Sequence, residues 1–260
     1  ILILGVSHGA LDNIKGRKLI KILKIKNISY FYLVYILIGL GIILLWILFP
    51  QSLLLLFLII ASYHFGKEDS EFISKNKNFE LIYFLKGSLV IVSPLLFHKY
   101  ETLNIFKSLN FDISESIFLN NEILYLFIFV SFISNIILSL NKSLNSKSLL
   151  LMDFLSILIL NYFLNPIIAF TIYFCFLHSI RHSISLIKDI NRNIKKGFPI
   201  FLKKAMPLTV ITALAYLFSL FFLNNYYEFN EAIYKVIFIG LAALTFPHIL
   251  LEYLIEKNEK

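Results

Sequence analysis

Long apolar segments separated by short polar ones dominate this sequence and limit what it can fold into. Of its 260 residues, 58% are hydrophobic and 15% are charged, against about 45–50% and about 25% in soluble globular domains. Each crossing of a bilayer needs about 20 apolar residues, so membrane spans fill a chain of this length. The composition excludes a disordered chain, a coiled coil, a disulfide scaffold and an ordinary water-soluble enzyme. We therefore expect an all-α, polytopic transmembrane helical bundle that forms a single domain over residues 1–260.

Nine apolar segments are visible along the chain. They cover residues 1–12, 28–49, 53–66, 79–97, 122–140, 149–164, 166–187, 206–223 and 232–254. The first is too short to cross a bilayer, so we expect it to be the end of a truncated span. The third and sixth are also short. We expect them to borrow residues from tight turns at Pro50-Gln51-Ser52 and Asn165-Pro166, because proline and asparagine favour turns.

Lysine and arginine are distributed unevenly between the two sides of this predicted bundle. If the loop 13–27 is cytoplasmic, the segments on its side hold 19 of the 24 basic residues, and the opposite segments hold only Lys99 and Lys107. Basic residues gather on the cytoplasmic side of membrane proteins. The sequence therefore predicts a cell (inner) membrane protein with its N-terminus outside and its C-terminus inside. The net charge of +8 is explained by these loops and not by nucleic acid, since no binding motif accompanies it.

Five of the six histidines share the cytoplasmic half of the odd-numbered segments, whereas His98 lies at the opposite side. The five are His8, His64, His178, His182 and His248. An ionisable residue inside a span costs about 2–3 kcal/mol or more and usually faces the bundle interior for a functional reason. A spacing of four residues puts His178 and His182 on one helix face, where they can give a metal two nitrogens. Neutral imidazole suits Fe, Zn, Cu and Ni, so we predict a metal site in the cytoplasmic half.

Carboxylates follow two of these histidines by one helical turn. Asp12 comes four residues after His8, and Glu68 comes four residues after His64, with Asp69 next. A carboxylate on the same face can orient a ligand imidazole through its second nitrogen. The alternative is that these three acids are charges at helix ends.

Two other charged residues and the single cysteine need an interpretation. We expect Arg181 to pair with one of the three acids or to extend to the inner interface, and Asp153 to be an interfacial charge. Cys175 lies in an apolar run, which is typical of a buried hydrophobe. One cysteine excludes an internal disulfide and a cysteine metal cluster.

Four short blocks resemble the signature of a known family. They are Gly5-x-x-His8-Gly9-x-x-Asp12, His64-Phe65-Gly66-x-Glu68-Asp69, His178-Ser179-x-Arg181-His182 and Phe246-Pro247-His248. Their order, spacing and placement on helices resemble the Brp/Blh family, the bacterial and archaeal β-carotene 15,15′-dioxygenases. The blocks run from residue 5 to residue 248, so the resemblance covers the chain.

The resemblance implies a multi-pass membrane enzyme that splits the central double bond of β-carotene with O2 into two molecules of all-trans-retinal. It implies non-haem Fe²⁺ held by His8, His64, His178 and His182, with His248 close by but not a ligand. No catalytic residue is implied beyond the metal centre, and the acids and Arg181 keep supporting roles. Membrane lipid surrounds such an enzyme, and a retinal-binding rhodopsin is a downstream user by family analogy alone.

The residues that contact substrate are not identified by these blocks. The candidates to line a tunnel are the aromatic residues near the histidines, which alternatively face lipid or fill the core: Tyr63, Phe65, Tyr173, Phe174 and Phe246.

Other functions remain open at this point. A membrane desaturase or hydroxylase typically has about eight histidines in several paired boxes, whereas this chain has six histidines and one such pair. A membrane transporter favours interrupted helices and internal repeats, and we find no convincing repeat. A non-catalytic retinal- or carotenoid-binding partner would yield no product, and a bis-histidine haem protein would show a Soret band.

Overall fold

The computed structural model describes residues 11–73, 79–112 and 120–258. The described chain is built from helices, as the composition predicts. Seven helical stretches within it are long and apolar enough to cross a membrane: Ser29–Leu48, Glu80–Phe97, Asn121–Ser139, Leu144–Phe163, Pro166–Ile190, Ile194–Leu223 and Phe229–Asn258. The chain is therefore a polytopic helical membrane protein.

These seven stretches overlap seven of the nine predicted segments. The largest difference is at Ile194–Leu223, which begins twelve residues before the predicted start at 206, so part of the predicted basic loop 188–204 is helical. The predicted third segment is also a helix, α3 (Pro50–Glu68), but it is not among the seven. Residues 1–10 of the predicted first segment lie outside the described residues. The number of nine spans and the orientation of the termini stay predictions.

The two predicted turns differ in outcome. Asn165 caps α9 (Pro166–Ile172), because its Oδ1 accepts a hydrogen bond from the Ile167 amide at 3.1 Å. The other predicted turn, Pro50-Gln51-Ser52, was wrong, because these three residues belong to a helix. The helix α2 (Ser29–Leu48) ends two residues before Pro50, which begins α3, and only Phe49 separates the two helices. Residues 50–52 therefore form the first turn of a helix. Proline is tolerated there because the first turn of a helix does not use its N–H groups.

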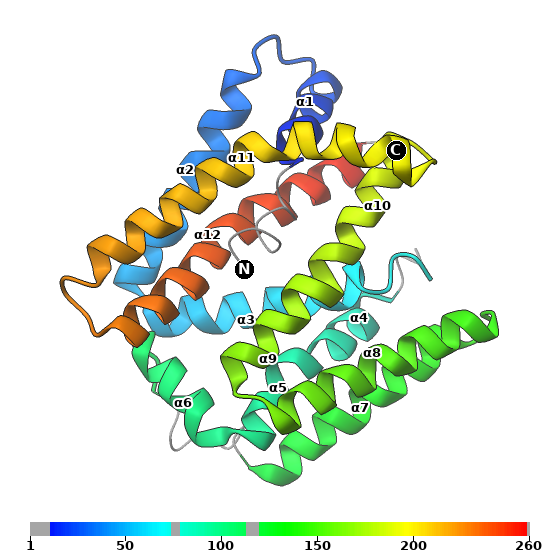
Figure 1. The fold of residues 1–260 in the computed structure, drawn as a ribbon, viewed down its shortest axis with the longest axis vertical. Helices are drawn as coiled ribbons and strands as arrows, with labels where there is room; N and C mark the ends of the chain where they lie inside the picture. The colour runs from blue at the N-terminus through cyan, green and yellow to red at the C-terminus, as the bar shows by residue number, and fades with distance from the viewer. Residues whose placement is uncertain (1–10, 74–78, 113–119, 259–260) are drawn as a thin grey trace. The chain divides into compact units, whose positions relative to one another are not determined.

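The chain divides into two compact units. Unit 1 consists of Ile1–Leu53 and Leu186–Lys260, and it contains α1 (Asp12–Ile22), α2, α11 (Ile194–Leu223) and α12 (Phe229–Asn258). The long helix α12 packs against α1, α2 and α11 (Figure 1). A cluster of buried apolar side chains from α1, α2 and α12 joins these helices: Leu19, Ile20, Phe31, Leu251 and Ile255. The prediction of a single domain over 1–260 stays a prediction.

Unit 2 consists of Leu54–Ser185. It contains most of α3, then α4 (Glu80–Gly87), α5 (Leu89–Phe97), α6 (Lys99–Ser108), α7 (Asn121–Ser139), α8 (Leu144–Phe163), α9, the π-helical segment η4 (Tyr173–Ser179) and the start of α10 (Ile180–Ile190). The helices α4 and α5 pack on α7, and α8 runs beside α7 (Figure 1). Small polar residues of α7 are buried in these contacts, and the Ser131 hydroxyl donates to the Lys86 carbonyl at 3.2 Å.

Two glycines let α3 and α4 cross with their backbones in contact. A Cβ on Gly66 would lie 1.7 Å from the Tyr83 carbonyl oxygen, and a Cβ on Gly87 would lie 1.9 Å from that of Ser62. Only glycine fits at such an approach. This crossing fixes the end of α3, which carries residues of the candidate site.

Candidate functional site

Unit 2 buries three of the predicted metal ligands. His64 lies on α3, His178 on η4 and His182 on α10, and their exposed fractions are 6%, 1% and 7%. The ring centroids of His64 and His178 are 5.5 Å apart, with planes at 71°. An imidazole nitrogen about 2.1 Å from a metal puts the ring centroid about 3.3 Å from it, so two rings on one ion lie about 5 Å apart. The spacing of these two rings therefore fits two ligands of one ion.

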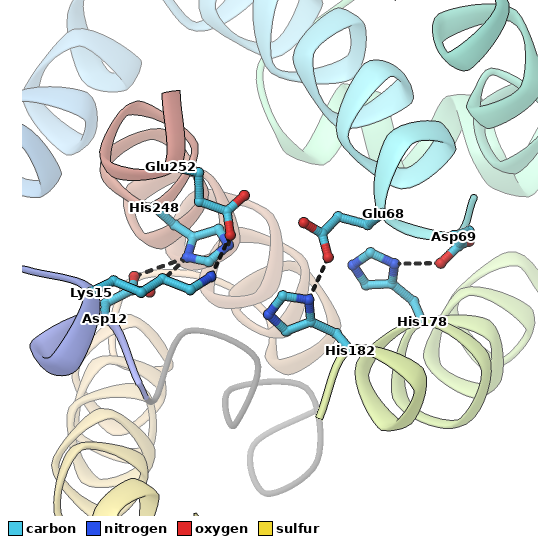
Figure 2. Close-up of polar contacts among 8 residues, drawn as sticks. All are labelled: Asp12, Lys15, Glu68, Asp69, His178, His182, His248 and Glu252. Atoms are coloured by element: carbon cyan, nitrogen blue, oxygen red, sulfur yellow. Dashed lines mark hydrogen bonds and ion pairs between the residues drawn. The ribbon is translucent and has the colours of Figure 1, made fainter. Parts of the chain in front are cut away.

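Two consecutive carboxylates at the end of α3 contact the Nδ1 atoms of His178 and His182. The Asp69 Oδ1 lies 2.9 Å from His178 Nδ1, and the Glu68 Oε2 forms an ion-pair contact with His182 Nδ1 (Figure 2). An ionised carboxylate only accepts hydrogen bonds, so Nδ1 carries the proton and the lone pair lies on Nε2. This is the support that proteins give to histidines that bind metals.

The structure corrects the partner expected for Glu68. Its spacing from His64 suggested that it serves a histidine of its own helix, whereas its contact is with His182 on α10. The reason is that the α3 face that carries both residues also meets η4 and α10, so the acid meets an imidazole from another element. The corresponding pairing of Asp12 with His8 cannot be followed, since His8 lies outside the described residues.

Asp69 is held in its charged form. Burial would raise the pKa of Asp69, but its contact with His178, followed by the charges of Lys86 and Arg181, keeps it below its ordinary value. The Tyr173 hydroxyl also donates to Asp69 Oδ2 at 2.6 Å. Both carboxylate oxygens of Asp69 therefore have a hydrogen-bond donor.

The π-helical segment η4 explains how Tyr173 and His178 reach the same carboxylate. These residues are five apart, and an α-helix would turn them about 140° away from each other. A π-helical turn closes with i→i+5 hydrogen bonds, which brings residues of this spacing onto one face. This turn could not be predicted from the sequence, because no residue type marks it. We expected Tyr173 only as an aromatic residue near the site.

Aromatic rings enclose the His178 imidazole. The Phe174 ring stacks on it at 5.7 Å with planes at 21°, and the Phe65 ring meets it edge-on at 4.9 Å. Both phenylalanines are buried. They restrict the orientation of the imidazole and exclude water from it.

Arg181 has a different partner from the ones predicted. Its guanidinium donates to both oxygens of Asp153 on α8, each at 2.7 Å, and lies 5.0 Å from the centroid of the Phe72 ring. The prediction that it pairs with Asp12, Glu68 or Asp69 was wrong. Asp153 is buried and forms this ion pair, and its expected place at the membrane interface stays a prediction. The opposite charges of Arg181 and Asp153 at a similar predicted depth were the signal that could have found this pair.

Unit 1 holds a related arrangement around His248. The Asp12 carboxylate lies 2.8 Å from His248 Nδ1 and accepts a hydrogen bond from the Tyr35 hydroxyl at 2.7 Å. One turn along α12, Glu252 forms an ion pair with Lys15, and its Oε1 lies 3.5 Å from His248 Nε2 (Figure 2). His248 is thus held at Nδ1 by an acid, like His178 and His182. Sequence reasoning named Asp12 and His248 as supporting residues but did not find their contact.

Two other residues noted in the sequence, His98 and Cys175, lie in α-helical and π-helical surroundings, respectively. His98 lies between α5 and α6, with its Nδ1 4.0 Å from a carboxylate oxygen of Glu101. Cys175 is buried in η4, as predicted.

Comparisons with known proteins agree with this picture. The sequence model of the β-carotene 15,15′-dioxygenase family matches residues 1–256. A β-carotene 15,15′-dioxygenase from uncultured marine bacterium 66A03 is 29% identical over 253 residues, which cover 96% of this chain and 90% of that protein. No solved structure matches the chain. The extent of the family match shows that the chain belongs to the β-carotene 15,15′-dioxygenases, the Blh family of oxygenases that its histidine blocks resemble.

Proposed function

We propose that this protein cleaves the central 15,15′ double bond of β-carotene with O2 and releases two molecules of all-trans-retinal. The observation that carries the proposal is the family match over residues 1–256, a range that includes every histidine of the chain. Buried histidines with carboxylates on Nδ1 support it, because this arrangement prepares imidazole for a metal.

The cofactor in this proposal is Fe²⁺, and its ligands are His64, His178 and His182 together with His8. Three buried imidazoles are a donor set that suits iron, and the spacing of the His64 and His178 rings fits a shared ion. Bound iron supplies the activation of O2. Asp69 and Glu68 keep the Nδ1 protons in place, so each imidazole offers Nε2 in a fixed direction. Phe65 and Phe174 pack around His178 and keep water away.

The membrane setting suits the substrate. β-Carotene is a long apolar polyene that dissolves in the bilayer, and a protein with seven candidate spans can take it directly from lipid. The uneven distribution of basic residues supports a place in the cell (inner) membrane with the metal site in the cytoplasmic half. A retinal-binding rhodopsin is the kind of protein that would use the product.

The test is retinal formation by the purified protein. Protein in detergent, loaded with Fe²⁺ and given β-carotene under air, should yield retinal, and removal of iron with a chelator should abolish the yield. The variant His64→Ala should lose both iron and activity, whereas the matched variant His98→Ala should keep both. A folded, iron-loaded protein that binds β-carotene without forming retinal would contradict the proposal in favour of a carotenoid-binding or transport protein.

A further inference from the structure

We propose that Tyr173 is a positioning residue for the metal centre, which holds Asp69 so that Asp69 can hold His178. The inference deepens the proposed function and rests on it, because it takes His178 to be a metal ligand. Tyr173 itself is not expected to touch the metal.

The contacts at Asp69 carry the first step. Oδ1 accepts from His178 Nδ1 at 2.9 Å, and Oδ2 accepts from the Tyr173 hydroxyl at 2.6 Å. The terminal torsion of an aspartate is broad, so one hydrogen bond alone leaves the carboxylate free to rotate. A second donor on the other oxygen removes that freedom and keeps Oδ1 directed at His178.

The position of Asp69 makes this support necessary. The residue follows the last residue of α3, and its amide still donates to the Phe65 carbonyl at 3.0 Å, so its backbone is held whereas the terminal torsion of its side chain is not. Its side chain must nevertheless fix an imidazole that is 1% exposed. The tyrosine hydroxyl supplies the constraint that the backbone does not.

The π-helical turn carries the second step. It places Tyr173 and His178 on the face that meets Asp69, although they are five residues apart. Such turns are rare, and they occur frequently at functional sites. An ordinary α-helix over the same residues would break one of the two contacts with Asp69.

The same three residue types meet in unit 1. There Tyr35 donates to the acid, Asp12, that contacts His248 Nδ1. A tyrosine that holds a carboxylate on a histidine thus occurs in each unit, which indicates a purpose beyond the packing of one ring.

A tyrosine-to-phenylalanine substitution isolates the hydroxyl. Tyr173 is 2% exposed, and its ring packs edge-on against Phe65 at 5.5 Å, a contact that phenylalanine retains. Tyr216 provides the matched control, because it is buried and its hydroxyl has no hydrogen-bond partner among the described residues.

The experiment measures metal binding, with activity as a secondary readout. Purified full-length protein and the variants Tyr173→Phe and Tyr216→Phe are titrated anaerobically with Fe²⁺ against a chromophoric chelator. The same proteins are loaded with Co²⁺ for absorption spectra, and their melting temperatures are recorded in detergent. We expect Tyr173→Phe to weaken Fe²⁺ binding by about tenfold, the lower end of the range for residues that support metal ligands, and to alter the Co²⁺ spectrum. Tyr216→Phe should change neither.

A second pair of variants tests whether Tyr173 acts through Asp69. In an Asp69→Asn background, adding Tyr173→Phe should change Fe²⁺ affinity by less than about twofold, because residues that act through one another are not additive. The proposal would be overturned if the double variant lost Fe²⁺ affinity by the product of the losses in the two single variants. So would a Tyr173→Phe protein that melts earlier yet binds Fe²⁺ as tightly as the wild type, since that describes a structural role. A wild-type protein that binds no Fe²⁺ would instead contradict the proposed function on which the inference rests.

Discussion

Gly66→Ala tests the close packing of α3 against α4, because Gly66 lies where the two backbones are in contact. The added Cβ would start 1.7 Å from the Tyr83 carbonyl oxygen, whereas real Cβ atoms essentially never come within 3.0 Å of such a neighbour. The two backbones must therefore separate by at least 1.3 Å. A backbone carbonyl cannot rotate away as a side chain can, so the strain is not relieved locally.

The magnitude follows from this displacement. Overpacking of a core costs about 1–3 kcal/mol, and a clash between backbones belongs at the upper end. About 3 kcal/mol corresponds to a fall in melting temperature of about 6–12 °C for a chain of this size. Functional groups must be held within about 0.5 Å. A shift of α3 that carries His64 and Glu68 should therefore lower retinal formation even below the melting temperature.

The assay is thermal unfolding in detergent, together with Fe²⁺ content and retinal formation. Gly41→Ala is the matched control, because a Cβ there meets nothing within 4 Å and alanine is the better helix former. Gly87→Ala disrupts the same crossing, where its Cβ would lie 1.9 Å from the Ser62 carbonyl oxygen. The double variant should therefore cost less than the sum of the single ones. A Gly66→Ala protein as stable and as active as Gly41→Ala would refute the reasoning.

Two further predictions concern charge and metal. Asp153→Asn should destabilise the protein by about 1.5–3 kcal/mol in thermal unfolding, because it removes a charged acceptor from the partly exposed Arg181 guanidinium. Glu101→Gln, at an exposed pair with His98, should have almost no effect. Equal melting temperatures of the two variants would contradict the assignment. Protein stripped of metal should regain retinal formation with Fe²⁺ but not with Zn²⁺, which has no redox chemistry; full activity with Zn²⁺ would argue against oxygen activation by the bound metal.

The sequence was sufficient to locate most of the long helices. Apolar length alone located the seven stretches that can span a membrane, since a bilayer imposes that length on any helix. The i, i+4 spacing of His178 and His182 predicts that they share a helix face, and this stays a prediction, because His178 lies in η4 and His182 in α10.

The contacts among site residues were not readable from spacing. Glu68 lies one turn from His64 in sequence, yet it contacts His182, because tertiary packing decides which imidazole an acid meets. Arg181 contacts Asp153 for the same reason. The π-helical turn over Tyr173–Ser179 escaped prediction because no residue type marks it.

X-ray absorption spectroscopy of the iron-loaded protein tests the central claim most directly. The account predicts a first shell dominated by nitrogen at about 2.1 Å, with the multiple-scattering pattern of several imidazoles. That pattern should weaken in His178→Ala and persist in His98→Ala. A first shell of carboxylate oxygen without imidazole scattering would contradict the claim that these histidines hold the metal.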